Sequence, residues 1–95
     1  MAFFVINFRD KPNAFEVRAA AREAHLAYVA ELGKQVKLGG PYVDEQGRMI
    51  GSLIIVEAET MAEAQALHDK DPYKAAGVFE TSTITEWRLS AQNFT

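Results

Sequence analysis

Residues 3–8 read Phe3-Phe4-Val5-Ile6-Asn7-Phe8, an apolar run rich in aromatic and β-branched side chains that a turn at 10–13 ends. Such a run predicts a buried strand. Alternate residues of a strand face opposite sides of its sheet, and this run is apolar on both sides. We therefore expect helices to cover one face of the sheet and a second copy of the chain to cover the other, which makes a homodimer.

The pattern after this strand predicts a long helix and a hairpin. Asn13 is placed to cap a helix over 14–32, with Glu16 reaching back in a capping box and Gly33 ending it. Two extended segments follow at 35–43 and 49–56, separated by a polar turn that contains Gly47. The first segment should bend at Gly39-Gly40-Pro41, and the two segments should pair as a hairpin.

The last third of the chain predicts a short helix and a final strand. Thr60 and Glu63 repeat the capping-box pattern, and the helix that they open should end near Lys70, because Pro72 disfavours helical geometry at the residue before it. Strict alternation over 78–89 predicts a strand with Phe79 and Trp87 on the same face. The complete order is βαββαβ, which is typical of a ferredoxin-like α+β fold with two helices on one face of an antiparallel sheet.

Composition excludes several classes of function. A chain of 95 residues with 48% hydrophobic residues fits a single globular domain over 1–95. The absence of cysteine excludes disulfide scaffolds, thiolate nucleophiles and cysteine-held metal centres. Scattered basic residues and a net charge of -3 disfavour nucleic acid as a partner. The apolar run at the start lacks a basic leader and is too short for a membrane span, so we expect a cytoplasmic protein.

The predicted long helix carries cations where apolar residues are expected. One side is charged or small and should face solvent, through Glu16, Ala20, Glu23, Ala27, Glu31 and Lys34. The opposite stripe is apolar, through Phe15, Ala19, Leu26, Val29 and Leu32. Arg22 falls within that stripe, and Arg18 and His25 lie at its edge. An arginine that faces the core needs partners or an opening to water, so a cleft is expected beneath the helix.

Two interpretations of this cluster are open. In the first, Arg22 forms an ordinary ion pair and His25 is a buried histidine that is hydrogen-bonded to backbone. In the second, His25 transfers protons near neutral pH and Asp71, at the end of the second helix, orients its ring. Asp71 has its own plain explanation, since an aspartate before proline commonly ends a helix or forms a turn.

Other candidate sites are weaker. His68 and Asp71 are three residues apart on a helix and could join His25 in a two-histidine, one-carboxylate metal set, but no metal-binding spacing motif occurs. The Gly51-Ser52 pair predicts a bulge or a close approach of two backbones. Alternatively, Ser52 and nearby backbone N–H groups would offer hydrogen bonds to a ligand oxygen at the mouth of a pocket.

Five segments of the chain together resemble the YciI family of YCII-related proteins, and the resemblance covers nearly the whole chain. They are Arg22-Glu23-Ala24-His25-Leu26, Gly39-Gly40-Pro41, Gly51-Ser52, Asp71-Pro72-Tyr73 and Ala76-Gly77-Val78. The resemblance implies a dimeric α+β barrel with a site built around His25 and Asp71. It further implies that Arg22, Gly40, Pro41, Ser52 and Tyr73 line the same cleft.

The function that the resemblance implies is a small enzyme that performs acid–base chemistry without a cofactor. His25 would be the base or acid and Asp71 its orienting partner, in an elimination such as dehydrochlorination or in an isomerisation of a small, aromatic substrate. An alternative is a non-catalytic accessory domain that binds a small anion in the same cleft. A third interpretation, a cofactor-free monooxygenase, rests on analogy with related dimeric α+β barrels alone.

Overall fold

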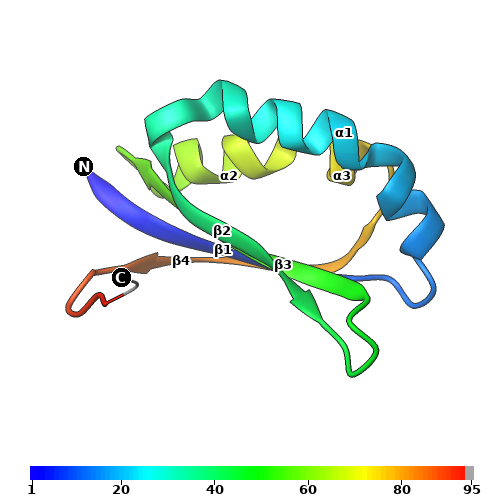
Figure 1. Cartoon of the computed structure of the whole chain (residues 1–95). Coiled ribbons are helices and arrows are strands. Elements are labelled where there is room, and N and C mark those ends of the chain that lie inside the picture. The colour runs from blue at the N-terminus through cyan, green and yellow to red at the C-terminus, as the bar shows by residue number, and fades with distance from the viewer. Residues whose placement is uncertain (94–95) are drawn as a thin grey trace.

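A computed structural model describes residues 1–93 of the chain. The strands and helices follow the predicted order βαββαβ, and the strands form one antiparallel sheet in the order β2-β3-β1-β4. All helices lie on one face of this sheet (Figure 1). The ferredoxin-like α+β prediction is therefore confirmed. The elements are β1 (Ala2–Asp10), α1 (Phe15–Leu32), the 3-10 turn η1 (Gly33–Gln35), β2 (Val36–Val43), β3 (Met49–Ala58), α2 (Met61–Asp69), α3 (Pro72–Ala75) and β4 (Phe79–Trp87).

Strand β1 occupies the centre of the sheet and supplies much of the core. Phe4, Ile6 and Phe8 alternate along it, face the helices and are almost completely buried. Phe8 lies opposite Ser52 on β3 and Ser82 on β4, so one serine stands on each side of its ring. This register places two hydroxyl groups symmetrically beneath the helices.

The inward face of α1 differs from the predicted apolar stripe. Arg18 and His25, which were expected at its edge, are buried, whereas Arg22 is exposed and Leu26 is 50% exposed. The helix is thus rotated relative to the orientation that its hydrophobic residues alone predict. Polar side chains can take the buried positions because each finds a partner there, as described below. The expected solvent-facing side of the helix is exposed.

The helix ends confirm some capping predictions and correct one. Asn13 adopts a positive φ of 60°, and α1 begins at Phe15 without a side-chain cap, so the predicted Asn13–Glu16 capping box does not form. Gly33 ends α1 with a φ of 58°, as expected for glycine. At α2, Thr60 Oγ1 accepts a hydrogen bond from the N–H of Glu63 at 3.1 Å, as predicted.

A break in register changes the prediction for β4. Arg9 pairs with Thr81 but Asp10 pairs with Phe79, so the alternation shifts by one residue at the start of the strand. Phe79 therefore packs against Phe8 on the helix side, 4.0 Å between ring centres, while Trp87 packs against Phe3 near the open face. The prediction that Phe79 and Trp87 share a face is wrong. Within residues 1–93, no helix is long and apolar enough to cross a membrane.

Candidate functional site

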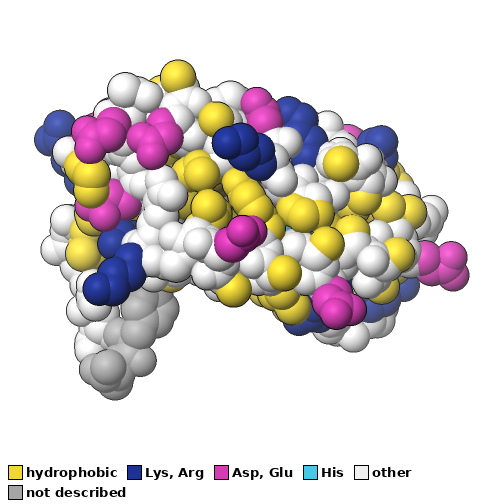
Figure 2. Space-filling model, turned by 90° about the horizontal axis from the view of Figure 1, so that it is seen from above, with side chains coloured by type: hydrophobic (Ala, Val, Ile, Leu, Met, Phe, Trp, Pro, Cys, Tyr) yellow, Lys and Arg dark blue, Asp and Glu magenta, His cyan; other side chains and the backbone are white. Residues whose placement is uncertain are grey.

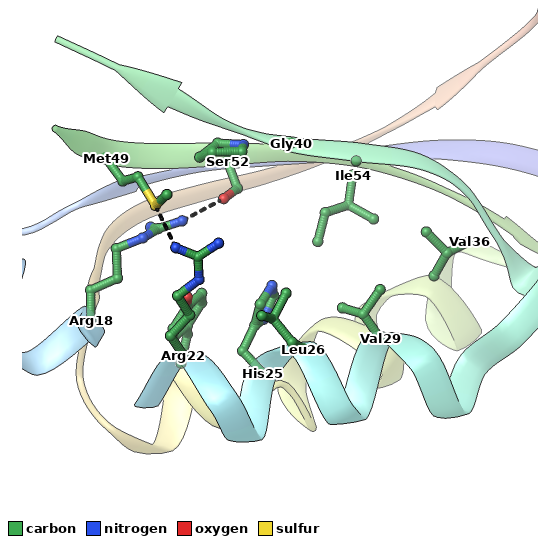
Figure 3. Close-up of a pocket in the computed structure, with 13 residues that line it drawn as sticks. Arg18, Arg22, His25, Leu26, Val29, Val36, Gly40, Met49, Ser52 and Ile54 are labelled. Atoms are coloured by element: carbon green, nitrogen blue, oxygen red, sulfur yellow. Dashed lines mark hydrogen bonds between the residues drawn. The ribbon is translucent and has the colours of Figure 1, made fainter. Parts of the chain in front are cut away.

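A pocket of about 190 Å³ opens between α1 and the helix-facing side of β2 and β3. Its wall on the α1 side comes from Arg18, Arg22, His25, Leu26 and Val29, and the sheet contributes Val36, Gly39, Gly40, Pro41, Met49, Ser52 and Ile54, with Tyr73 from α3. Figure 3 shows these side chains pointing toward one another across the cavity. Seen from the helix side, a band of hydrophobic side chains runs across the middle of the molecule (Figure 2). The predicted lining residues Arg22, Gly40, Pro41, Ser52 and Tyr73 all lie around this one pocket.

His25, which lines the pocket, contacts Asp71. Nδ1 of His25 lies 2.9 Å from Oδ1 and 3.1 Å from Oδ2 of Asp71, and both side chains are buried. An ionised carboxylate can only accept hydrogen bonds, so it favours the ring form that carries its hydrogen on Nδ1. Nε2 is then left with a free lone pair, and the ring itself lines the cavity (Figure 3).

Asp71 is held in place by the local chain. It precedes Pro72, the first residue of α3, and its Oδ1 accepts a hydrogen bond from the N–H of Tyr73 at 2.9 Å. Its backbone is extended, as expected for an N-cap before proline. The turn-forming interpretation of Asp71 and its pairing with His25 are thus both realised by the same carboxylate.

Arg18 belongs to the site, although the sequence analysis did not place it there. Its guanidinium donates to Oδ2 of Asp10 at 2.8 Å and to Oγ of Ser52 at 3.0 Å, and it lies 4.8 Å above the ring of Tyr73. One signal pointed to it: Arg18 and His25 are seven residues apart, or two helical turns, so they share one face of α1. Oδ1 of Asp10 and Nε of Arg18 are buried and have no hydrogen-bond partner within the described residues.

Tyr73 connects the arginine to the histidine. Its ring stacks on His25 at 4.1 Å between ring centres, with an angle of 12° between the planes, and Arg18 lies over the same ring. Burial raises the pKa of the Tyr73 hydroxyl above its ordinary value of 10.0, although Arg18 and Arg22 oppose this shift. The hydroxyl therefore keeps its proton at neutral pH and can donate a hydrogen bond, but it cannot serve as a base.

Arg22 lies at the mouth of the pocket and is more open. Nη1 of its guanidinium approaches the sulfur of Met49 at 3.6 Å, a weak acceptor, and within residues 1–93 it forms no ion pair. The predicted ion pair of Arg22 is thus not formed. A guanidinium in this position can bind an anionic group of a ligand at little desolvation cost.

The metal set considered from the sequence is not assembled. His68 is buried on the other side of Phe8, where its Nε2 lies 2.9 Å from Oγ of Ser82. In the described part of the chain, no three His, Asp or Glu side chains are arranged to hold a metal ion, and this includes His25, His68 and Asp71.

Comparisons with known proteins agree with the fold. The model of the YCII-related domain matches residues 2–88. Protein YciI of Escherichia coli O6:H1 is 37% identical over 93 residues, which cover 90% of this chain and 95% of that protein. An uncharacterized protein of Haemophilus influenzae is 33% identical over 81% of this chain and 87% of its own length.

Two solved structures extend the comparison. A 5-chloro-2-hydroxyhydroquinone dehydrochlorinase, TftG, from Burkholderia phenoliruptrix superposes with a TM-score of 0.86 at 31% identity, covering 93% of this chain and 95% of that one. That structure is a complex with 2,5-dihydroxybenzoquinone. An antibiotic biosynthesis monooxygenase has a TM-score of 0.56 at 11% identity over 96% of this chain and all of that one, which shows a shared fold and nothing more.

Proposed function

The chain belongs to the family of YCII-related domains, and we propose that it is an enzyme that removes a proton from a small hydroxylated aromatic substrate without a cofactor. The reaction that follows is an elimination, such as loss of hydrogen chloride, or an isomerisation, since both can begin with removal of the acidic proton of a ring hydroxyl. The observation that carries this proposal is the hydrogen bond between the buried carboxylate of Asp71 and His25, whose ring lines a pocket with two arginines. The relative TftG, which acts on a chlorinated hydroxyhydroquinone, supports the class of substrate.

In the proposed reaction, His25 is the base. Its Nε2 takes a proton from the substrate, and the carboxylate of Asp71 stabilises the imidazolium that forms. The stacked ring of Tyr73 restricts rotation of the imidazole, so that Nε2 stays directed at the cavity. Returning the proton to another position of the ring gives isomerisation, and loss of a leaving group such as chloride gives elimination.

Ser52 and Arg22 would stabilise the negative charge that develops on a substrate oxygen. Because Oγ of Ser52 accepts a hydrogen bond from Arg18, the hydroxyl's own hydrogen is free to donate to a ligand. Arg22 adds a mobile positive charge at the mouth of the pocket. Such donors act where charge builds up in the transition state, which is the usual source of the largest rate effects. Gly40 and Pro41 would shape the wall opposite α1.

We further propose that two copies of the chain pack through the open face of the sheet. Phe3, Ile55 and Trp87 lie around an apolar hollow of about 670 Å³ on the side away from the helices, and Leu89 beside it is 49% exposed. Large contiguous apolar surface of this kind favours association. Sedimentation equilibrium tests the dimer: a monomer at micromolar concentration would contradict it.

Chloride release from 5-chloro-2-hydroxyhydroquinone tests the enzymatic proposal. We expect His25→Asn to lower kcat/KM by about 100- to 10,000-fold, the usual contribution of a general base. Asp71→Asn should also lower it, because an amide can turn the wrong group toward Nδ1 and destabilise the reactive ring form. Glu23→Gln, an exposed change on the same helix, is the matched control and should keep the parent rate. An unchanged rate in His25→Asn would refute the role of His25.

A second candidate is a domain that binds a small anion in this cleft without chemistry, and the exposed guanidinium of Arg22 favours it. Calorimetric titration with 2,5-dihydroxybenzoquinone distinguishes the binding domain from the enzyme. Binding that Arg22→Ala abolishes and that is indifferent to His25→Asn, together with no chloride release by the parent protein, would favour the binding domain.

A further inference from the structure

A second pair of chemically active side chains lies outside the pocket of His25. Oγ of Ser82 and Nε2 of His68 are 2.9 Å apart, at one side of a groove of about 360 Å³ between α2, α3 and β4. The groove is also lined by Lys11, Lys74 and Gly77. None of these residues belongs to the pocket of His25. A hydroxyl in hydrogen-bond contact with an imidazole is the arrangement that activates a serine nucleophile.

The two partners differ in exposure as a nucleophile and its base should. Ser82 is exposed on the helix side of β4, whereas His68 is buried. The His68 ring is stacked 4.9 Å from Phe79 and 5.9 Å from Phe8, at angles of 19° and 28°. Stacking on two rings from different strands fixes the imidazole plane without a carboxylate partner. The base is therefore held rigidly while the hydroxyl remains accessible to a ligand.

The surroundings of His68 keep its ring neutral. Burial lowers the pKa of His68, and the charge of Lys74 acts in the same direction. The carboxylates of Asp71 and Asp69 oppose this effect, but the net direction is downward. At neutral pH the ring is therefore uncharged, and with its hydrogen on Nδ1 it can accept the proton of Ser82 at Nε2.

We propose that Ser82 is a second nucleophile of this protein, with His68 as its base, and that it takes an acyl group from a small activated ester bearing a negative charge. Ser82 Oγ attacks the ester carbonyl while its proton passes to Nε2 of His68. The bond to the leaving group then breaks, the leaving oxygen receives that proton, and an acyl-serine forms. Water completes the cycle in the reverse sense: it adds to the acyl group, gives a proton to His68, and releases a carboxylic acid and free Ser82.

The charge preference follows from the lysines of the groove. Lys74 contacts the carboxylate of Asp69, so its charge is partly neutralised, while Lys11 forms no ion pair within residues 1–93. An acyl donor with a terminal carboxylate can place that group at Lys11. This site and its chemistry do not depend on the function proposed for His25.

The test uses mono-p-nitrophenyl succinate, with p-nitrophenyl acetate as the neutral reference, on the intact protein. We expect a burst of p-nitrophenolate and a succinyl group on Ser82, identified by mass spectrometry of the proteolysed protein. Ser82→Ala should lower the burst rate by about 100-fold or more. Lys11→Ala should slow the reaction of the succinyl ester and leave that of the acetyl ester nearly unchanged.

Two controls keep the result interpretable. Ser90→Ala changes another exposed serine that does not line the groove, and this variant should react like the parent protein. His68→Gln should lose the burst, and where this buried change impairs folding, the pH dependence of the burst in the parent protein replaces it. That burst should fall as His68 is protonated, with the same midpoint that NMR gives for its ring. An acyl group on Lys11 or Lys74, an undiminished burst in Ser82→Ala, or a burst that does not follow the titration of His68 would overturn the proposal.

Discussion

The serine hydroxyls on the two sides of Phe8 have different partners, a cation on one side and a histidine on the other. In the sheet, Ser52 and Ser82 are its neighbours on the two flanking strands, and a helix places a buried histidine above each side. On the α1 side, Ser52 meets the cation Arg18, and the buried groups form a charged network with Asp10. On the α2 side, Ser82 contacts the imidazole of His68, and no ion pair among residues 1–93 is buried there. One register of the sheet thus presents one hydroxyl to a cation and the other to a neutral base.

This difference determines how strongly substitutions on each side of Phe8 should reduce the stability of the protein. A buried guanidinium is stable only while its carboxylate partner and hydrogen bonds remain, since an unpaired buried charge is very costly. A neutral histidine stacked against aromatic rings has no buried charge to compensate. We therefore expect substitutions on the Arg18 side to have larger effects on stability than matched substitutions on the His68 side.

The largest effect is expected at Arg18. Arg18→Met keeps an apolar stem of similar length but leaves the carboxylate of Asp10 buried without its cation, which should reduce the free energy of unfolding by about 3–5 kcal/mol. Urea denaturation at pH 7 measures it. The double variant Asp10→Asn with Arg18→Met removes the stranded charge and should recover most of the loss. A double variant as unstable as the single one would show that the charge is not the cause.

A medium effect is expected where the two flanking strands approach β1. Arg9 is paired with Gly51 on β3 and with Thr81 on β4. A Cβ at Gly51 would lie 2.4 Å from the carbonyl oxygen of Phe8, which is backbone and cannot move aside easily. Gly51→Ala should therefore cost about 1–3 kcal/mol of stability through overpacking.

Thr81→Ala is the matched control for Gly51→Ala, because Thr81 is exposed and already accommodates a side chain. It should change stability by less than about 0.5 kcal/mol. Equal losses in the two variants, measured in the same urea experiment, would mean that the close approach at Gly51 does not distinguish the strands.

The sequence predicts the elements and their order well because local signals dominate there. The alternation in β1, the cap at Thr60 and the glycine at Gly33 depend on neighbours in the chain, and the structure confirms them. The predicted inward face of α1 was wrong because hydrophobicity places Arg18 and His25 only at the edge of the stripe. Asp10 on β1, Ser52 on β3 and Asp71 before α3 stabilise both side chains in the interior. Those partners are 8 to 46 residues away, so no local pattern contains them.

The residues of the candidate site likewise fall into those that the sequence predicts and those that depend on contacts between distant parts of the chain. The helix pattern drew attention to Arg22 and His25, and motifs of the family indicated Asp71 and the lining residues. In the structure His25 and those lining residues surround one pocket, and Asp71 contacts His25. Arg18 was noted at the edge of the stripe but was not assigned to the site. Its contacts are with Asp10 and Ser52, which only the pairing of the strands brings beside it. Phe79 faces the helices because the pairing of β1 with β4 shifts register between Arg9 and Asp10. Phe79 thereby becomes part of the groove that contains His68. The alternation within β4 alone cannot reveal this shift.

The smallest effect concerns the pH dependence of stability on the His68 side. Burial lowers the pKa of His68 in the folded protein, whereas the pKa of a histidine in the unfolded chain is about 6.5. As the pH falls from about 7, the unfolded chain takes up this proton first, so the contribution of His68 to stability declines and is lost once the pH is below the folded pKa. One proton changes the free energy of unfolding by at most about 1.4 kcal/mol per pH unit.

Urea denaturation of the parent and of His68→Gln between pH 7 and pH 5 isolates the contribution, because the remaining groups titrate alike in both. The parent should lose more stability than the variant on acidification. A constant difference across this range would mean that the histidine is not desolvated as its stacking against Phe8 and Phe79 implies.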